Sequence, residues 1–230
     1  RDRLRSRGLG DVYKRQQKKD RFETFPAFSP DGRTLYFCSA EAKKIPEEYK
    51  EIRYNLCSID FDPSAGTFGS RIDTLVNAEA LGKSVSFPRP SYDGKYIMFT
   101  LSDYGNFSIW HKEANLWLLD LTSGDLRELS EVNSDDTESF HNWSSNSRWF
   151  VFSSRRGDGL YTHLYLASMD ENGKISKPFL LPQEDPETYY DRSVYSYNVP
   201  DFVNAPILLD TKVFEKRITS KERIQVQVGN

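Results

Sequence analysis

The sequence of 230 residues is poor in the residue types from which disulfide scaffolds and metal centres are built. It has two cysteines and three histidines, and no His or further Cys stands at ligand-like spacing from either cysteine. Cys38 and Cys57 both lie in strand-like runs, so we expect two buried apolar side chains; a disulfide between neighbouring strands and a reactive thiol are the alternatives. No apolar run reaches the about 18–20 residues of a transmembrane helix, so no transmembrane segment is predicted.

Charge is unevenly distributed along the chain. Residues 1–16 hold six basic and two acidic residues, whereas the whole chain holds 31 basic and 34 acidic residues, so the remainder is acidic. An acidic body argues against a nucleic-acid partner. Residues 1–16 lack strand-like alternation and a helical apolar stripe, and they resemble translated sequencing-adapter sequence. We expect a disordered, non-native segment there; a basic arm and a linker are the alternatives.

Three stretches of the sequence repeat one pattern of an aromatic residue, a Ser, a turn triplet, a basic residue and an alternating apolar run. Pro30 and Gly32 suit the second and fourth positions of a tight turn between two strands. In the third copy Asn146 and Ser147 replace Asp-Gly, so we expect that turn to be shifted or to place Asn146 in the left-handed region. The three copies are FPAFSPDGRTLYF (25–37), FPRPSYDGKYIMF (87–99) and FHNWSSNSRWFVF (140–152).

Each copy is followed by further short strand-like runs, such as NLCSID (55–60), NLWLLDL (115–121) and HLYLASMD (163–170). Units of four short antiparallel strands cannot bury both faces of their sheets alone, so they stack radially as the blades of a β-propeller. A β-solenoid needs shorter repeats, and a two-sheet sandwich does not predict three similar units. The sequence therefore predicts an all-β fold, a partial β-propeller of about three four-stranded antiparallel blades. The predicted boundaries are blades at 20–75, 76–131 and 132–185, a closing strand near 195–202, and a C-terminal tail at 203–230.

The repeats resemble the WD-type repeats of the TolB-like β-propeller family, over about residues 20–185. The match rests on Pro-x-aromatic-Ser-Pro-Asp-Gly-Arg followed by a Leu-x-x-x-Asp strand, and it is weakest in the third copy. Propellers of this family are usually closed rings of six or more blades. The resemblance therefore implies a C-terminal fragment whose missing blades lie N-terminally, and a periplasmic or envelope setting, although no signal peptide is visible.

No catalytic residues, metal ligands or cofactor-binding motif are predicted. The sequence has no Gly-x-Ser-x-Gly elbow and no Cys/His pairing that would activate a thiol. His111, His141 and His163 occupy non-equivalent positions of the repeat, and only His141 is expected near the propeller axis. RRGDG (155–159) is interpreted as a turn.

Two groups of residues are candidates for binding. The first lies at the expected mouth of the axial channel, where the alternative is a solvated loop. The second is an aromatic-rich connection at 102–115, where the alternative is a loop folded back onto its own blade. The channel-mouth candidates are Asp135, Asp136, Glu138, His141, Glu23 and Lys83, and the aromatic-loop candidates are Tyr104, Phe107 and Trp110.

The function favoured by these observations is a non-enzymatic binding or scaffolding module that engages a protein or an envelope polymer. The resemblance also brings two alternatives. One is an oligogalacturonide-like polysaccharide lyase with a metal near His141. The other is the propeller domain of a prolyl-oligopeptidase-like peptidase whose catalytic domain is absent from this sequence.

Overall fold

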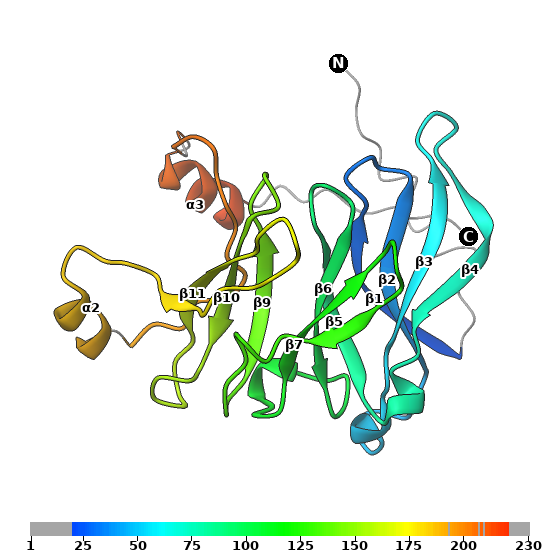
Figure 1. Cartoon of the computed structure of the whole chain (residues 1–230), viewed down its shortest axis with the longest axis horizontal. Helices are drawn as coiled ribbons and strands as arrows, with labels where there is room; N and C mark the ends of the chain where they lie inside the picture. Colours follow the sequence, from blue (N-terminus) through cyan, green and yellow to red (C-terminus); the bar gives the residue numbers. More distant parts are fainter. Residues whose placement is uncertain (1–19, 193, 207, 209, 221–230) are drawn as a thin grey trace.

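A computed structural model describes residues 20–192, 194–206, 208 and 210–220 (Figure 1). Residues 1–16, for which a non-native segment is predicted, lie outside this part of the chain. The strands form three four-stranded sheets, called blades 1 to 3 below. Blade 1 contains β1 (Arg21–Phe28), β2 (Thr34–Glu41), β3 (Asn55–Asp62) and β4 (Thr67–Val76); blade 2 contains β5 (Ser84–Pro90), β6 (Tyr96–Ser102), β7 (Asn115–Asp120) and β8 (Leu126–Glu128); blade 3 contains β9 (Glu138–Trp143), β10 (Trp149–Ser154), β11 (His163–Ser168) and β12 (Phe179–Leu180).

Strands within each blade pair antiparallel in sequence order, so each blade is a meander. The first strands of successive blades are neighbours, because β1 contacts β5 and β5 contacts β9. These inner strands stand side by side while the blades stack face to face (Figure 1). The predicted all-β fold of three four-stranded antiparallel blades, arranged as a partial β-propeller, is confirmed.

The core lies between the blades and follows from strand alternation, because successive side chains point to opposite faces of a sheet. Between blades 1 and 2, Cys38 and Leu56 pack with Ile97 and Phe99. Between blades 2 and 3, Met98 and Leu118 pack with residues that include Phe150 and Phe152. Successive side chains of β6 therefore lie alternately in one interface and in the other, which is why its sequence is a nearly unbroken apolar run.

Both cysteines are free and buried. Cys38 pairs across the sheet with Leu56, and Cys57 pairs with Phe37, so the two thiols belong to opposite faces of blade 1. Burial raises the pKa of both thiols. They are packing residues, as the first of the three interpretations predicts.

The third repeat turn differs from the prediction. Ser147, not Asn146, has the positive φ of 56°, and it takes the place that Gly32 and Gly94 take in the other copies. The turn is not shifted, because Ser147 N donates to Ser144 O at 2.9 Å just as Gly32 N donates to Ser29 O at 2.9 Å. Asn146 instead accepts hydrogen bonds from Ser144 Oγ at 2.7 Å and Arg148 N at 3.0 Å, the role of Asp31 in the first copy.

Each inner strand contains a β-bulge at the same position of the repeat. The pairing register shifts between Thr24 and Ala27 in β1 and between Ser86 and Arg89 in β5, and a matching shift occurs in β9. The phenylalanine within each bulge has a left-handed backbone, a conformation that bulky residues rarely adopt. The three residues are Phe25 (φ 54°), Phe87 (φ 53°) and Phe140 (φ 48°).

Beyond blade 3 the chain forms two short helices, α2 (Pro186–Arg192) and α3 (Thr211–Thr219). Residues 195–202, between these helices, carry no strand pairing and lie against blade 3 through hydrogen bonds to Thr162 and Ser153. Neither helix, nor any other in the described part of the chain, has the length and apolar character needed to span a bilayer.

Candidate binding surface

The predicted channel-mouth residues belong to the end of the blades where the inner strands begin, the lower end in Figure 1. Asp135 and Asp136 precede β9, Lys83 precedes β5, and Glu23 lies in β1. Lys83 Nζ pairs with Asp103 Oδ1 of its own blade at 2.6 Å. Asp136 Oδ1 accepts from Thr137 N at 2.8 Å. Burial raises the pKa of the Glu23 carboxyl, and neighbouring Arg21 opposes that rise.

Glu138 is completely buried, so the structure places it inside the sheet rather than at an open mouth. Its Oε1 atom accepts from Ser134 Oγ at 2.6 Å, Ser154 Oγ at 2.9 Å and Arg156 Nη2 at 2.9 Å. Burial raises the pKa of the Glu138 carboxyl, and its hydrogen bonds and Arg156 counter this only in part. The Arg156 guanidinium also stacks on the ring of Tyr165, with 4.6 Å to the centroid. Through these contacts Glu138 and Arg156 connect β9 with Ser154 of β10 and Tyr165 of β11, so the ion pair has a structural role within blade 3.

His141 is also buried, with 1% of its surface exposed. Its Nε2 lies 2.9 Å from the Met98 carbonyl oxygen in blade 2, so this nitrogen must carry the proton and donate it. Burial lowers the pKa of His141 to about 3, which keeps the imidazole neutral. Nε2 therefore has no lone pair for a metal, and the lone pair of the neutral ring lies on Nδ1, which is also buried. No cluster of three or more His, Cys, Asp or Glu side chains suited to a metal occurs in the described ranges.

The three aromatic-loop candidates separate into one packed residue and two exposed ones. Tyr104 packs on His111 with ring centroids 4.0 Å apart. His111 holds the loop together, because its Nδ1 lies 3.1 Å from Glu113 Oε1 and its Nε2 lies 3.0 Å from Asn106 O. Phe107 and Trp110, by contrast, are 72% and 67% exposed. Phe107 precedes the 3-10 helix η3 (Ser108–Trp110) and has a left-handed conformation with φ of 51°, and Trp110 is the last residue of this helix.

Arg155 of blade 3 completes this surface, although its local sequence, RRGDG at 155–159, indicates only a turn. The Arg155 guanidinium lies over the Trp110 ring, 4.6 Å from its centroid. Arg155 is itself buried, its Nη2 donates to Gly159 O, and its backbone N donates to Thr137 O at 3.3 Å. A cation over an indole face is an attractive pair. The hydrogen bonds to Gly159 and Thr137 hold Arg155 in place for this contact. We call Phe107, Trp110, Arg155 and Asp136 the rim.

The rim is assembled from loops of two blades. Thr137 Oγ1, before β9, donates to Ser108 O of η3 at 3.3 Å. Asp136 Oδ2 lies 3.5 Å from the position that a Cβ would take at Gly159. The aromatic loop, the acidic turn and the β10–β11 connection are therefore one contiguous surface, so the structure brings Asp136 together with Phe107 and Trp110. Glu23 lies in blade 1, and Lys83 of blade 2 pairs with Asp103 instead.

The inner strands also share an aromatic ladder. The rings of Phe25 and Phe87 have centroids 4.3 Å apart, and those of Phe87 and Phe140 have centroids 4.8 Å apart. These are the residues with left-handed backbones in the three bulges. The bulge thus turns one phenylalanine per blade toward the next, which links the blades at their inner edges.

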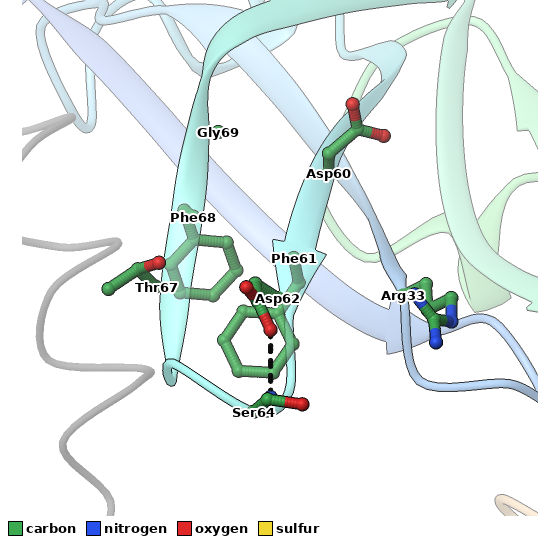
Figure 2. Close-up of a pocket in the computed structure, with 8 residues that line it drawn as sticks. All are labelled: Arg33, Asp60, Phe61, Asp62, Ser64, Thr67, Phe68 and Gly69. Atoms are coloured by element: carbon green, nitrogen blue, oxygen red, sulfur yellow. Dashed lines mark hydrogen bonds between the residues drawn. The ribbon is translucent and has the colours of Figure 1, made fainter.

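A separate hollow of about 520 Å³ lies on blade 1 at the turn between β3 and β4 (Figure 2). The aromatic rings of Phe61 and Phe68 form one wall, with centroids 4.7 Å apart. Asp62 closes the turn by accepting from Ser64 N at 2.8 Å, and Arg33 stands across from it (Figure 2). None of the predicted site residues lines this hollow.

No protein-family model matches the sequence, and no curated protein is significantly similar to it. Among solved structures, the chain is similar to TolB from Acinetobacter baumannii, with 18% identity and a TM-score of 0.40 over 68% of this chain and 32% of that one. It is similar to the β-propeller domain of the Trilobed protease from Pyrococcus furiosus, with 16% identity and a TM-score of 0.41 over 71% and 44%. It is also similar to an oligogalacturonate lyase from Vibrio parahaemolyticus, with 15% identity and a TM-score of 0.41 over 69% and 39%.

The chain thus spans less than half the length of each of these proteins. At such identities the likeness concerns the fold alone.

Proposed function

We propose that this chain is a non-catalytic binding or scaffolding module of the TolB-like propeller type that contacts a protein or an envelope polymer through the rim. The proposed setting is the bacterial envelope. The observation that carries the proposal is the exposure of Phe107 and Trp110 beside a cation that is already held in position.

Exposed aromatic side chains of this kind supply much of the energy at protein interfaces and on sugar-binding surfaces. Trp110 is stacked on Arg155 and anchored at the end of η3, so its ring is oriented before a partner arrives. A side chain that is already ordered loses little conformational entropy on binding. Phe107 adds a backbone strained at φ 51°, a feature that clusters at functional sites.

Asp135 and Asp136 add acidic groups beside this aromatic surface, and Arg155 adds a cation. The rim therefore suits a partner that offers an apolar or sugar face together with polar groups of both signs. By contrast, the titratable groups that a catalytic interpretation would use, Glu138 and His141, are buried. The Glu138 carboxylate is engaged by Arg156 within blade 3, and the His141 imidazole bonds to Met98 of blade 2.

The test compares three variants of the full chain: Phe107→Ala and Trp110→Ala at the rim, and Tyr92→Ala as a matched exposed aromatic at the opposite end of blade 2. Binding of a polymer is measured by co-sedimentation with purified peptidoglycan sacculi. Contact with envelope proteins is measured by placing a photo-crosslinking amino acid at position 110 or at position 92.

We expect the rim variants to lose about tenfold or more in affinity for the sacculi, or the crosslinks to form from position 110 only, while Tyr92→Ala behaves as the wild type. The proposal would be contradicted if the rim variants and Tyr92→Ala lost affinity for the sacculi equally. It would also be contradicted if the chain bound no sacculi and formed no crosslink from position 110. Cleavage of polygalacturonate that depends on His141 would favour the lyase alternative instead.

A further inference from the structure

One backbone hydrogen bond recurs at each junction between blades. In each case an N–H near the start of an inner strand donates to the carbonyl of the residue immediately before the third strand of the preceding blade. Tyr54 precedes β3, Ala114 precedes β7 and Thr162 precedes β11. The three bonds are Val85 N to Tyr54 O at 2.9 Å, Glu138 N to Ala114 O at 2.8 Å, and Tyr197 N to Thr162 O at 3.0 Å.

The third of these bonds belongs to residues 195–202, which follow blade 3 and carry no strand pairing of their own. Its place in the series makes Tyr197 equivalent to Val85 and Glu138. By the same count Pro200 is equivalent to Pro88, and Asp201 is equivalent to Arg89 and Asn142. Asn142 and Asp201 are in fact neighbours, with Asn142 Nδ2 donating to Asp201 Oδ1 at 3.0 Å.

Side-chain contacts also hold the segment against blade 3. Ser153 Oγ of β10 donates to Asn198 O at 2.7 Å, one position further along than the corresponding bond of β6, in which Thr100 Oγ1 donates to Glu138 O, the equivalent of Tyr197, at 3.4 Å. Residues 195–202 therefore lie on the face of blade 3 as β9 lies on the face of blade 2.

We infer that residues 195–202 are the inner strand of a fourth blade, and that its free edge is a docking site for one antiparallel strand supplied by another polypeptide segment. Residues 195–202 do not add to blade 3 beside β10, because β10 already has β9 on one side and β11 on the other. In blades 2 and 3 the equivalent inner strands each pair with a second strand, β6 or β10.

The outer edge of 195–202 has the properties of an unpaired strand. Within the described ranges the backbone N–H groups of Asn198, Val199 and Asp201 donate no hydrogen bond. Val199 and Phe202 are 53% and 38% exposed, although their repeat equivalents Phe140 and Trp143 pack between blades. An edge with unpaired backbone groups and apolar side chains is a template for strand addition.

The occupant that fits is an extended segment with alternating apolar and polar side chains like β10, because β10 pairs with β9 at the equivalent edge of blade 3. Main-chain hydrogen bonds would hold it, and its apolar face would cover Val199 and Phe202. The probe is therefore a synthetic peptide of residues 146–155, which contains β10, with a scrambled peptide of the same composition as the control.

The experiment adds each peptide to the full chain and follows amide hydrogen exchange across residues 195–203, with affinity measured by fluorescence anisotropy. We expect the β10 peptide to slow exchange at 198–202 and to bind about tenfold or more tightly than the scrambled peptide. Asn198→Pro removes an edge N–H and should abolish this binding, while Asn204→Pro, the same change outside the segment, should leave it intact.

A second variant, Phe202→Lys, keeps the backbone N–H groups and places a charge on the edge, and it should also weaken binding. The inference is wrong if the β10 peptide leaves exchange at 198–202 unchanged, or if Asn198→Pro and Asn204→Pro bind it equally. It is also wrong if the amides of 198–202 are already protected before any peptide is added.

Discussion

The backbone N–H of Asp93 donates to Ser147 Oγ at 2.9 Å, and this bond joins the turn of blade 2 to the turn of blade 3. It explains how a serine occupies a position that glycine fills in the other repeats. Ser147 is buried with φ of 56°, a conformation that costs an L-residue about 1–2 kcal/mol. The hydrogen bond to the neighbouring blade offsets about 1 kcal/mol of that strain.

We predict that Ser147→Ala, which loses the hydrogen bond and keeps the strain, lowers the free energy of unfolding by about 1–1.5 kcal/mol. Ser147→Gly loses the same bond but relieves the strain, so its stability should lie within about 0.5 kcal/mol of the wild type. Urea denaturation of both variants measures the difference. Gly94→Ala is the matched control, since a Cβ there meets no atom within 4 Å and only its φ of 71° opposes the change.

The second prediction concerns the buried Glu138–Arg156 pair. Arg156→Ala leaves the Glu138 carboxylate buried without its cation, so we expect a loss of about 3–5 kcal/mol in the free energy of unfolding at neutral pH. Glu138→Gln keeps a side chain of the same shape for Ser134 and Ser154, and we expect a much smaller loss. If the two variants were equally destabilised in urea, the cost would not arise from the unpaired charge.

The pH dependence of Glu138 has the opposite sign from that of most carboxyl groups. Its pKa is raised in the folded state, so the folded protein binds this proton more tightly than the unfolded chain. Its contribution to stability therefore increases as the pH falls through the folded pKa toward the ordinary value of 4.5. Glu138→Gln should remove this component, which stability curves of wild type and variant at several pH values would reveal.

Much of the fold was predictable because local sequence patterns indicate its turns and strands. Ser29-Pro30-Asp31-Gly32 and its two copies mark the turns, and period-2 apolar runs beside them mark the strands. Repetition of those patterns predicts stacked blades. The aromatic loop was also visible as a cluster of rings in one connection, although Tyr104 turned out to be a packing residue.

The remainder depends on contacts between blades, which a single sequence does not encode locally. Arg155 reaches Trp110 across a blade junction, Ser147 depends on Asp93, and His141 donates to Met98. Each pair is separated by more than forty residues, and neither partner of any pair has a residue type or spacing that signals the other. Glu138 looked like a mouth residue for the same reason, because its partner Arg156 lies in a different strand connection.

The third prediction concerns His141, whose pKa is lowered to about 3 in the folded protein from 6.5. Folding therefore disfavours its protonation, and the stability present above pH 6.5 is lost progressively as the pH falls toward 3. The shift corresponds to roughly 5 kcal/mol. His141→Gln retains a donor for the Met98 carbonyl and does not titrate, so its stability should fall less between these pH values. A parallel decline in both proteins would show that His141 does not contribute.

The fourth prediction uses Gly105 to move the aromatic loop without touching its exposed residues. A Cβ at Gly105 would lie 2.3 Å from Tyr54 Cδ2 and 2.9 Å from Ser84 Oγ, so Gly105→Ala must displace either the loop or the Tyr54 ring. Gly157→Ala is the matched control in the β10–β11 connection, since its Cβ would lie an ordinary 3.7 Å from His163 Nδ1.

We expect Gly105→Ala to lower the free energy of unfolding by about 1–3 kcal/mol and to alter Trp110 fluorescence quenching by acrylamide, because the loop that carries the indole shifts away from Arg155. Gly157→Ala should change neither by a comparable amount. If Gly105→Ala leaves Trp110 unaffected, the close packing of Tyr54 on Gly105 does not position the indole.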